Sequence, residues 1–416
     1  MKRTAPMLAI LAAVAAAIGY YSYGQNNLYQ RYAEMRVDWA ETSDGPIDIA
    51  IVWPFADKTH FLDGVQFAVD DVNVKGIFGG RRLVPTYFNE ENPDTSADVA
   101  EKIGRTPRFM AVIGHVASET AISASVTYEY FGILFIAPFA SDPSLTSHRF
   151  QHVLRVIPPA QESCRCLALF AARAGFKKVG ILFNRDGYKG LYAAMFLYFG
   201  DPEGIKASFV SSYGSECRDF RPLLADARST DMDAMLVLDS LPLAAKVIKQ
   251  ARQMGITQPL MGGHEIDSPN LWRLAGAAAD GTYVPTIFDP TAGGSDLEMG
   301  FSRRFRTRFG HYPDLAASLG YEAVSVYAQA VERTHSTMPL VVATTLYHEG
   351  PFHGVGEDMS FTAYGDPVGR EIFVKVVKRG HFEIVPGSET RTVPWEPESQ
   401  TQSAVLRDST QPDEGD

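Results

Sequence analysis

Small, aromatic and ionisable side chains stand at or just after the ends of short apolar runs in this sequence. Ten residues fit this description: Trp53, Ala117, Ser118, Phe139, Ala140, Ser141, Tyr188, Asp239, His264 and Glu265. Hydroxyls and free backbone amides bind a carboxylate, whereas a carboxylate binds an ammonium group. These residue types therefore predict that the protein recognises a small polar molecule.

Three of these residues also have purely structural interpretations. Ser118 precedes a predicted helix over residues 119–130, whose first amides are free hydrogen-bond donors at the positive end of the helix dipole. Ser118 therefore either binds an anion with those amides or acts only as the N-cap of the helix, and one residue could do both. Ser141 either contacts a ligand or closes the turn before Pro143, and Trp53 either forms a cleft wall or packs in the core.

Composition and missing motifs exclude several classes of protein. Acidic residues outnumber basic ones by 49 to 38, and a chain of net charge −11 without a Lys/Arg block is a poor nucleic-acid binder. Three cysteines are too few for a four-cysteine zinc or iron–sulfur site. The hydrolase-elbow, phosphate-loop and zinc-protease motifs are absent, so we expect no enzyme activity, no cofactor and no metal.

The elements that must position these residues alternate along the chain. Between about residues 46 and 386, short runs rich in Val and Ile are followed by longer segments with helical spacing. This alternation predicts an α/β fold with parallel sheets covered by helices on both faces. In open α/β sheets ligands bind outside the carboxyl ends of the strands, so two lobes whose strand ends face each other would place all of these residues around one cleft.

The two ends of the sequence are predicted to lie outside the fold. Lys2 and Arg3 precede an apolar stretch over residues 7–23, so residues 1–25 are either a secretory signal peptide or an uncleaved membrane anchor. Residues 387–416 are rich in Ser, Thr, Pro, Glu and Gln and predict a disordered acidic tail. Just before this tail, the strand-like runs 371–378 and 380–385 predict a hairpin.

A likeness to a known family is carried by five segments, residues 64–73, 113–118, 136–141, 186–188 and 250–255. In order and spacing they resemble the type I periplasmic solute-binding proteins, in particular the leucine/isoleucine/valine-binding group that serves ABC importers. The resemblance covers about residues 47–384. It implies two Rossmann-like lobes that close over a ligand by a hinge motion.

The resemblance also implies where the chain passes between the lobes. Three crossovers would fall near residues 155–158, 283–288 and 354–361. The first lobe would then comprise residues 46–157 and 286–355, and the second lobe residues 158–285 and 356–386.

Roles for individual residues follow from the same resemblance. In the branched-chain group, a serine after the third strand and a serine or threonine after the fourth hold the α-carboxylate of the ligand, and Ser118 and Ser141 stand at these positions. Phe139 replaces the usual alanine, but its backbone carbonyl would still accept a hydrogen bond from an ammonium group. Tyr188 matches an aromatic residue that packs on the ligand from the second lobe; otherwise it is a surface tyrosine at a helix start.

The acidic partner of the ligand's ammonium group departs from the family pattern. Direct alignment places His264 there, and a neutral histidine would not balance an ammonium charge. The expected substitute is Glu265, one residue further on, or Asp239, at the end of the preceding strand. The alternative is that both are solvated loop acids.

These features predict a non-enzymatic, extracytoplasmic or periplasmic protein that captures an amino acid or related polar solute. Permease subunits of an ABC transporter in the membrane would recognise its closed form. The alternative is a membrane-anchored sensing or regulatory module of the same fold, held by residues 1–25. An enzyme on this scaffold is least favoured, because no nucleophile with a base and an orienting partner is visible.

Overall fold

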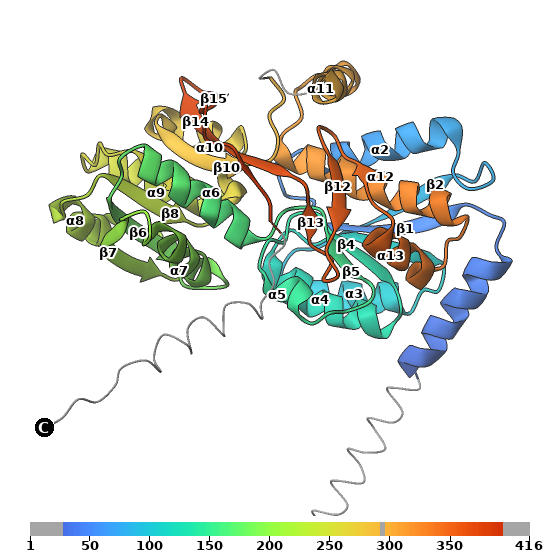
Figure 1. Ribbon diagram of the computed structural model, residues 1–416. Coiled ribbons are helices and arrows are strands. Elements are labelled where there is room, and N and C mark those ends of the chain that lie inside the picture. Colours follow the sequence, from blue (N-terminus) through green and yellow to red (C-terminus); the bar gives the residue numbers. More distant parts are fainter. Residues whose placement is uncertain (1–27, 292–295, 394–416) are drawn as a thin grey trace, which may run out of the picture.

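Two α/β lobes lie side by side in the computed structural model of the protein, which describes residues 28–291 and 296–393 (Figure 1). The predicted fold class, with two lobes built on parallel strands and covered by helices, is confirmed. The predicted signal peptide or anchor over residues 1–25 lies outside the described residues.

The first lobe is built on a five-stranded parallel sheet in the order β2-β1-β3-β4-β5. Its strands are β1 (Ile47–Trp53), β2 (Leu83–Asn89), β3 (Phe109–Gly114), β4 (Leu134–Ala137) and β5 (Val153–Arg155). β3 and β4 are buried along their whole length, because helices cover both faces of the sheet.

The helices of the first lobe come from both ends of the chain. One face of the sheet is covered by α2 (Phe61–Lys75), α12 (Leu315–Thr334) and α13 (Pro339–His348), and α11 (Asp296–Phe309) packs on α2. The other face is covered by α3 (Pro93–Gly104), α4 (Ser118–Tyr130) and the short α5 (Ser144–Ser147).

The second lobe has a larger, mixed sheet in the order β15-β14-β10-β9-β8-β6-β7. Its parallel strands are β6 (Lys178–Asn184), β7 (Lys206–Tyr213), β8 (Ala234–Leu238), β9 (Leu260–Gly262) and β10 (Thr282–Thr286). The predicted hairpin is confirmed, since β14 (Glu371–Lys378) and β15 (His381–Ile384) pair antiparallel at its edge. Its helices are α6 (Ala160–Arg173), α7 (Lys189–Gly200), α8 (Arg221–Ser229), α9 (Leu243–Gln253) and α10 (Asn270–Ala275).

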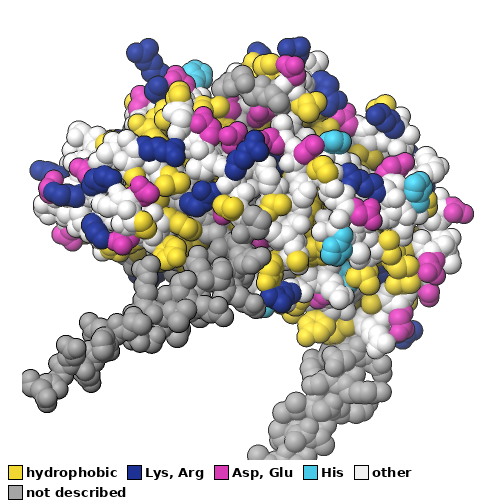
Figure 2. Space-filling view, in the orientation of Figure 1, with side chains coloured by type: hydrophobic (Ala, Val, Ile, Leu, Met, Phe, Trp, Pro, Cys, Tyr) yellow, Lys and Arg dark blue, Asp and Glu magenta, His cyan; other side chains and the backbone are white. Residues whose placement is uncertain are grey.

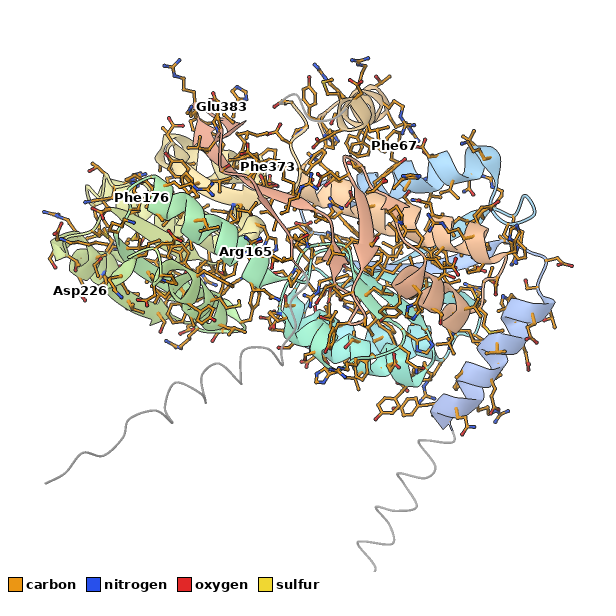
Figure 3. All side chains as sticks on the ribbon, in the orientation of Figure 1. Phe67, Arg165, Phe176, Asp226, Phe373 and Glu383 are labelled. Atoms are coloured by element: carbon orange, nitrogen blue, oxygen red, sulfur yellow. The ribbon has the colours of Figure 1, made fainter. Side chains whose placement is uncertain are left out.

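Each lobe has its own apolar core, and this separation locates the crossovers. Phe67 packs against Phe305 in the first lobe, whereas Phe176 packs against Phe170 in the second (Figure 3). The chain passes from the first core to the second between β5 and α6, and returns after β10, where Phe288 joins the first core.

The third crossover lies later in the chain than residues 354–361, where we expected it. A small sheet of β11 (Phe352–His353), β12 (Asp358–Phe361) and β13 (Pro367–Val368) packs on the first lobe, with Met359 and Phe361 in its core. The chain enters the second lobe only at β14, as the separation of the labels β12 and β14 in Figure 1 shows. The sequence of β12 has few apolar residues, so it does not indicate which of the two lobes this strand packs against.

Three buried ion pairs fasten these crossovers, and we call them the hinge pairs. Arg155 meets Asp366 at 2.7 Å, Arg370 meets Glu322 at 2.9 Å, and Lys375 meets Asp267 at 2.8 Å (N···O). Each joins residues far apart in sequence, and the Lys375 ammonium also donates to the Phe288 carbonyl at 3.1 Å. Separating the two members of such a pair would leave an uncompensated buried charge. The hinge pairs therefore hold the crossover segments in one arrangement.

A helix over residues 28–42 precedes β1 and was not expected from the sequence. Figure 1 shows it in dark blue against the side of the first lobe. The fully buried Arg36 attaches it, donating to the carbonyls of Phe109 at 2.9 Å, Gly104 at 2.9 Å and Thr106 at 3.2 Å, and also to that of Phe131. Burial lowers the pKa of Arg36 to about 9.

The prediction of a disordered tail is wrong for residues 387–393. The short strand β16 (Thr390–Arg391) pairs antiparallel with β14, and Ser388 is buried. The Ser388 hydroxyl oxygen accepts from the Val374 amide at 2.9 Å, so these polar residues satisfy the free edge of β14. The remainder of the predicted tail, residues 394–416, lies outside the described part of the chain.

The surface carries charges of both signs in a mixed distribution. On the face in Figure 2, Lys and Arg side chains alternate with Asp and Glu over both lobes. Such a mixture gives none of the concentrated positive charge that phosphate backbones require. Within residues 28–291 and 296–393, no helix is long and apolar enough to cross a membrane.

Candidate functional site

A cavity of about 430 Å³ lies between the two lobes. The first lobe lines it with Ala117, Ser118 and Phe139, and the second lobe with Tyr188, Asp239 and Glu265. All six follow the carboxyl ends of strands, as the rule for open α/β sheets requires. The structure therefore brings these six sequence-predicted residues together around one space.

A second cavity, of about 570 Å³, adjoins the first and shares Ala117, Phe139 and Glu265 with it. Trp53 forms part of its wall, together with apolar residues of the second lobe such as Leu241. Trp53 is itself almost fully buried: its ring stacks on Phe61 at 3.8 Å and its indole N–H donates to Asp57 at 2.7 Å. Both interpretations of Trp53 thus hold, because one face packs in the core and another borders the cavity.

The loop that carries Ser118 is held by a buried polar network. His115 has a left-handed backbone (φ 61°), and its ring bonds to Glu90 at 2.8 Å and to the Tyr128 hydroxyl at 2.9 Å. Ser118 is not the N-cap, since it is the first residue of α4 and Ala117 precedes it in extended conformation. The Ser118 hydroxyl oxygen instead accepts from the Asp142 amide at 3.2 Å, and its proton is left for another acceptor.

Ser141 and Tyr188 join the two lobes directly. The Tyr188 hydroxyl donates to Glu265 Oε1 at 2.5 Å and lies 2.8 Å from Ser141 Oγ. Because tyrosine has a single hydroxyl proton, Ser141 must donate to Tyr188. Ser141 is fully buried beneath this contact and does not line the cavity, so the hydroxyl assigned to a ligand carboxylate is engaged by Tyr188 in this conformation.

Lys189, which the sequence analysis missed, forms an ion pair with Glu265. Its ammonium nitrogen also lies 4.2 Å from the centre of the Tyr188 ring. Burial alone would raise the pKa of Glu265, but His264, the Lys189 ammonium and the Tyr188 hydroxyl together lower it to about 2. Glu265 is therefore ionised and already neutralised within the protein.

His264 and Ala140 lie behind the cavity rather than on it. The His264 ring is buried and packs on the Phe139 ring at 5.2 Å between centres; burial lowers its pKa, and the attraction of Glu265 opposes this shift. Ala140 is fully buried, and its carbonyl accepts from the Arg155 guanidinium at 3.1 Å. Neither residue lines the cavity, so the prediction that they contact a ligand through their side chains finds no geometric support.

Asp239 lines the cavity and is only 6% exposed. Its carboxylate accepts from the Tyr213 hydroxyl at 2.9 Å, the Ser240 amide at 2.7 Å and the Asn184 amide group at 3.4 Å. Burial raises the pKa of Asp239, and these hydrogen bonds and the more distant Lys189 ammonium oppose the shift. Asp239 is thus a pre-positioned buried carboxylate facing the cleft.

Several further residues of the cleft follow strands but were not singled out from the sequence. They are Glu90 after β2, Asn184 at the end of β6, Asp186 after β6, Ser215 after β7 and Ser240 after β8. The strand-end rule covers all five, but the sequence alone gave no reason to assign them a role in binding. The sequence gave less indication of a role for Lys189, because its position at the start of α7 does not show that its ammonium group pairs with Glu265.

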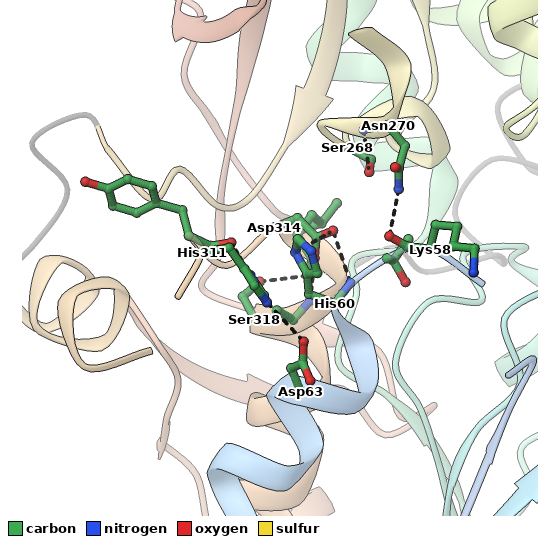
Figure 4. Close-up of polar contacts among 12 residues, drawn as sticks. Lys58, His60, Asp63, Ser268, Asn270, His311, Asp314 and Ser318 are labelled. Carbon is green, nitrogen blue, oxygen red and sulfur yellow. Dashed lines mark hydrogen bonds and ion pairs between the residues drawn. The ribbon is translucent and has the colours of Figure 1, made fainter. Parts of the chain in front are cut away.

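A further contact between the lobes lies beside the second cavity (Figure 4). The Asn270 side chain of the second lobe donates to the Lys58 carbonyl of the first at 2.8 Å. Nearby, the His60 and His311 rings stack at 3.8 Å, and His60 lies 3.5 Å from an oxygen of Asp314. No group of three or more potential metal ligands gathers within the described residues.

The fold and the cleft define a class of protein. Two hinged α/β lobes surround a cavity with residues from the strand ends of both, which suits reversible enclosure of a small solute. A family model described as periplasmic binding protein matches residues 56–381, and the chain belongs to this family. The protein is therefore a solute-binding protein and not an enzyme, and membership implies an extracytoplasmic location.

Several similar proteins are named for branched-chain amino acids. Leu/Ile/Val-binding protein homolog 2 of Brucella abortus is 28% identical over 308 residues, which cover 73% of this chain and 81% of the relative. A substrate-binding protein of an ABC transporter from Desulfitobacterium hafniense, solved with Leu, has a TM-score of 0.73 and 29% identity over 82% of this chain and all of its own. The leucine-binding protein of Thermotoga maritima shares the fold, with a TM-score of 0.76 at 22% identity over 82% of this chain and 97% of that one.

Proposed function

We propose that the protein captures an amino acid or a related polar solute in the interlobe cleft and presents it to the permease subunits of an ABC importer. The observation that carries this proposal is the cavity of about 430 Å³, which strand-end residues of both lobes line and which Tyr188 bridges. The names of the relatives support it, since several are amino-acid-binding proteins of importers.

The first lobe supplies the initial binding surface. The free amides at the start of α4 and the Ser118 hydroxyl proton form a site for a carboxylate. Phe139 borders the same space. A solute held there is still open to solvent on the side of the second lobe.

Closure then adds the second lobe. Tyr188 moves against Ser141, and Asp239 and the Glu265–Lys189 pair complete the wall. Because only the closed form places Tyr188 against Ser141, a solute that bridges the lobes shifts the equilibrium toward closure. The closed surface is what a permease would recognise.

Calorimetry with the 20 standard amino acids and thermal-shift screening with short amides and urea derivatives test this proposal. We expect at least one solute to bind with a negative heat-capacity change. Tyr188→Phe removes the hydroxyl that bridges Ser141 and Glu265, and we expect about tenfold weaker binding. Tyr130→Phe, on an exposed residue of the same lobe as Ser141, is the control and should bind as the unaltered protein does. Equal affinity of both variants, or no response to any solute, would contradict the proposal.

A second candidate function is a membrane-held sensor of the same fold. It rests on residues 1–25, whose apolar stretch is compatible with an uncleaved anchor. N-terminal sequencing of membrane and soluble fractions decides between them. A mature chain that begins near residue 25 in the soluble fraction favours the transport function.

A further inference from the structure

The interlobe cavity carries a surplus of negative charge. Six carboxylates line it against one ammonium group, that of Lys189: Glu90, Glu91, Glu119, Asp186, Asp239 and Glu265. Solvent screens Glu91, Glu119 and Asp186, which are exposed. Glu90 is bonded to the His115 ring and Glu265 is paired with Lys189. Asp239 is the remaining carboxylate, and it is buried.

Asp239 has hydrogen-bond donors but no counter-charge. Its partners are a tyrosine hydroxyl, a backbone amide and an asparagine amide group, and no cationic side chain of the described residues forms an ion pair with it. Lys189 acts on it only through a longer-range attraction, since its ammonium group pairs with Glu265. Buried carboxylates in proteins are ordinarily paired, so a positive charge supplied from outside the chain would complete this site.

The chemistry around Asp239 also discriminates against apolar groups. Asn184, Ser215 and Ser240 border the same end of the cavity. An aliphatic side chain of a ligand placed there would remove the remaining water from Asp239 without supplying a hydrogen bond or a positive charge to its carboxylate. A zwitterion of no net charge would leave the cavity as negative as before, because its own carboxylate cancels its ammonium group.

We propose that the cleft binds a solute of net positive charge, and that an ammonium or guanidinium group of this solute lies against Asp239. This inference rests on the proposed function and names the class of solute that the same cleft takes. It separates this chain from relatives whose names specify leucine, isoleucine and valine. The first lobe keeps its site for a carboxylate, so a basic amino acid and a simple amine are two sources of the same cationic group.

Four probes of similar size test the proposal by titration calorimetry with the full mature chain. L-Arginine carries the cation and the carboxylate, and agmatine keeps the cation without the carboxylate. L-Citrulline has nearly the shape of arginine without the side-chain charge, and L-leucine is the aliphatic reference. We expect arginine or agmatine to bind at least about tenfold more tightly than citrulline, and citrulline and leucine to bind weakly or not at all.

Variants then locate the cation. Asp239→Asn keeps the shape of the side chain and should weaken binding of the cationic probe by roughly 30-fold or more, while binding of citrulline stays within a few-fold. Tyr213→Phe removes one donor to Asp239 and should have a smaller effect in the same direction. Asp226→Asn changes an exposed acid of the same lobe on α8, away from the cavity (Figure 3), and should change neither affinity.

The outcomes separate this inference from the function on which it rests. Tight binding of leucine or citrulline with weak binding of arginine and agmatine overturns the inference and leaves the proposed function intact. Equal losses of arginine and citrulline binding in Asp239→Asn also overturn it. Tight binding of arginine alone supports the inference with a basic amino acid as the source, and tight binding of agmatine supports it with an amine. If none of the four probes binds, the inference is overturned. If none of the other screened solutes binds either, the proposed function is overturned as well.

Discussion

The hinge and the cleft both bury carboxylates, but only the hinge supplies each of them with a cation. At the hinge, Asp366, Glu322 and Asp267 meet Arg155, Arg370 and Lys375 within 2.9 Å. In the cleft, Glu265 is paired with Lys189, whereas Asp239 is held by neutral donors. Desolvation of a charge is costly in both places, and we interpret the difference by what each region does.

The comparison separates carboxylates that stabilise the fold from a carboxylate that is available to bind a solute. A carboxylate that is paired within the chain fixes one geometry, and the hinge pairs do so at crossovers that both open and closed forms must share. A carboxylate that is buried without a counter-charge makes the closed protein less stable until a cation arrives. Binding energy from that cation is then available to drive closure.

The largest expected effect concerns the hinge. Lys375→Met leaves the Asp267 carboxylate, which is only 2% exposed, without its cation, and we expect a loss of about 3–5 kcal/mol in the free energy of unfolding. Urea denaturation measures it. Lys378→Met on the same strand is the matched control: its pair with Glu383 is more than half exposed, so the loss should be about 0–1 kcal/mol. Comparable losses in the two variants would remove the distinction between hinge and surface pairs.

A second experiment concerns closure and uses two glycines with similar backbones. A Cβ added at Gly187 (φ 78°) would lie 1.8 Å from Glu119 Oε1, which reaches across from the first lobe, whereas one at Gly175 (φ 81°) meets nothing within 4 Å. Both alanine variants should lose about 1–2 kcal/mol of stability from the left-handed backbone. Only Gly187→Ala should also lose ligand affinity, by about two- to threefold, because the exposed Glu119 side chain must turn away before the lobes can close.

Adding Glu119→Ala tests the cause of that loss. The double variant Gly187→Ala/Glu119→Ala has no clash between the lobes, so its affinity should recover while its stability stays low. An affinity loss in Gly175→Ala of the same size would show that backbone strain, rather than contact between the lobes, controls binding.

The fold could be predicted because its signals are local and repeated. Solidly apolar runs such as residues 111–113 indicate strands of a sheet covered on both sides, and β3 is indeed buried throughout. The strand-end rule then predicted six cavity-lining residues without any knowledge of the tertiary structure. The hairpin of β14 and β15 was visible in the same way.

The parts that sequence reasoning missed depend on contacts between distant residues. Arg36 is buried because carbonyls of the first lobe surround it, and a charged residue in a polar segment gives no sign of this. The polar composition of residues 387–393 predicted a disordered tail, but residues of this segment pair with the free edge of β14. The pairing of Lys189 with Glu265 joins two distant segments of the second lobe, and the contact of Ser141 with Tyr188 depends on how the two lobes are placed against each other.

The smallest expected effect is a pH dependence that distinguishes the two carboxylates of the cleft. Burial raises the pKa of Asp239, so as the pH falls below neutrality it takes up a proton earlier than an ordinary aspartate. Glu265, whose pKa is lowered to about 2, keeps its charge over the same range. A cation binds only the ionised form of Asp239, so its affinity should fall roughly a few-fold between about pH 7 and 5, with release of protons on binding at the acidic end. Calorimetry with arginine or agmatine in two buffers of different ionisation enthalpy measures both quantities. Asp239→Asn should abolish the proton release, and an unaltered pH profile in that variant would assign the dependence to another group.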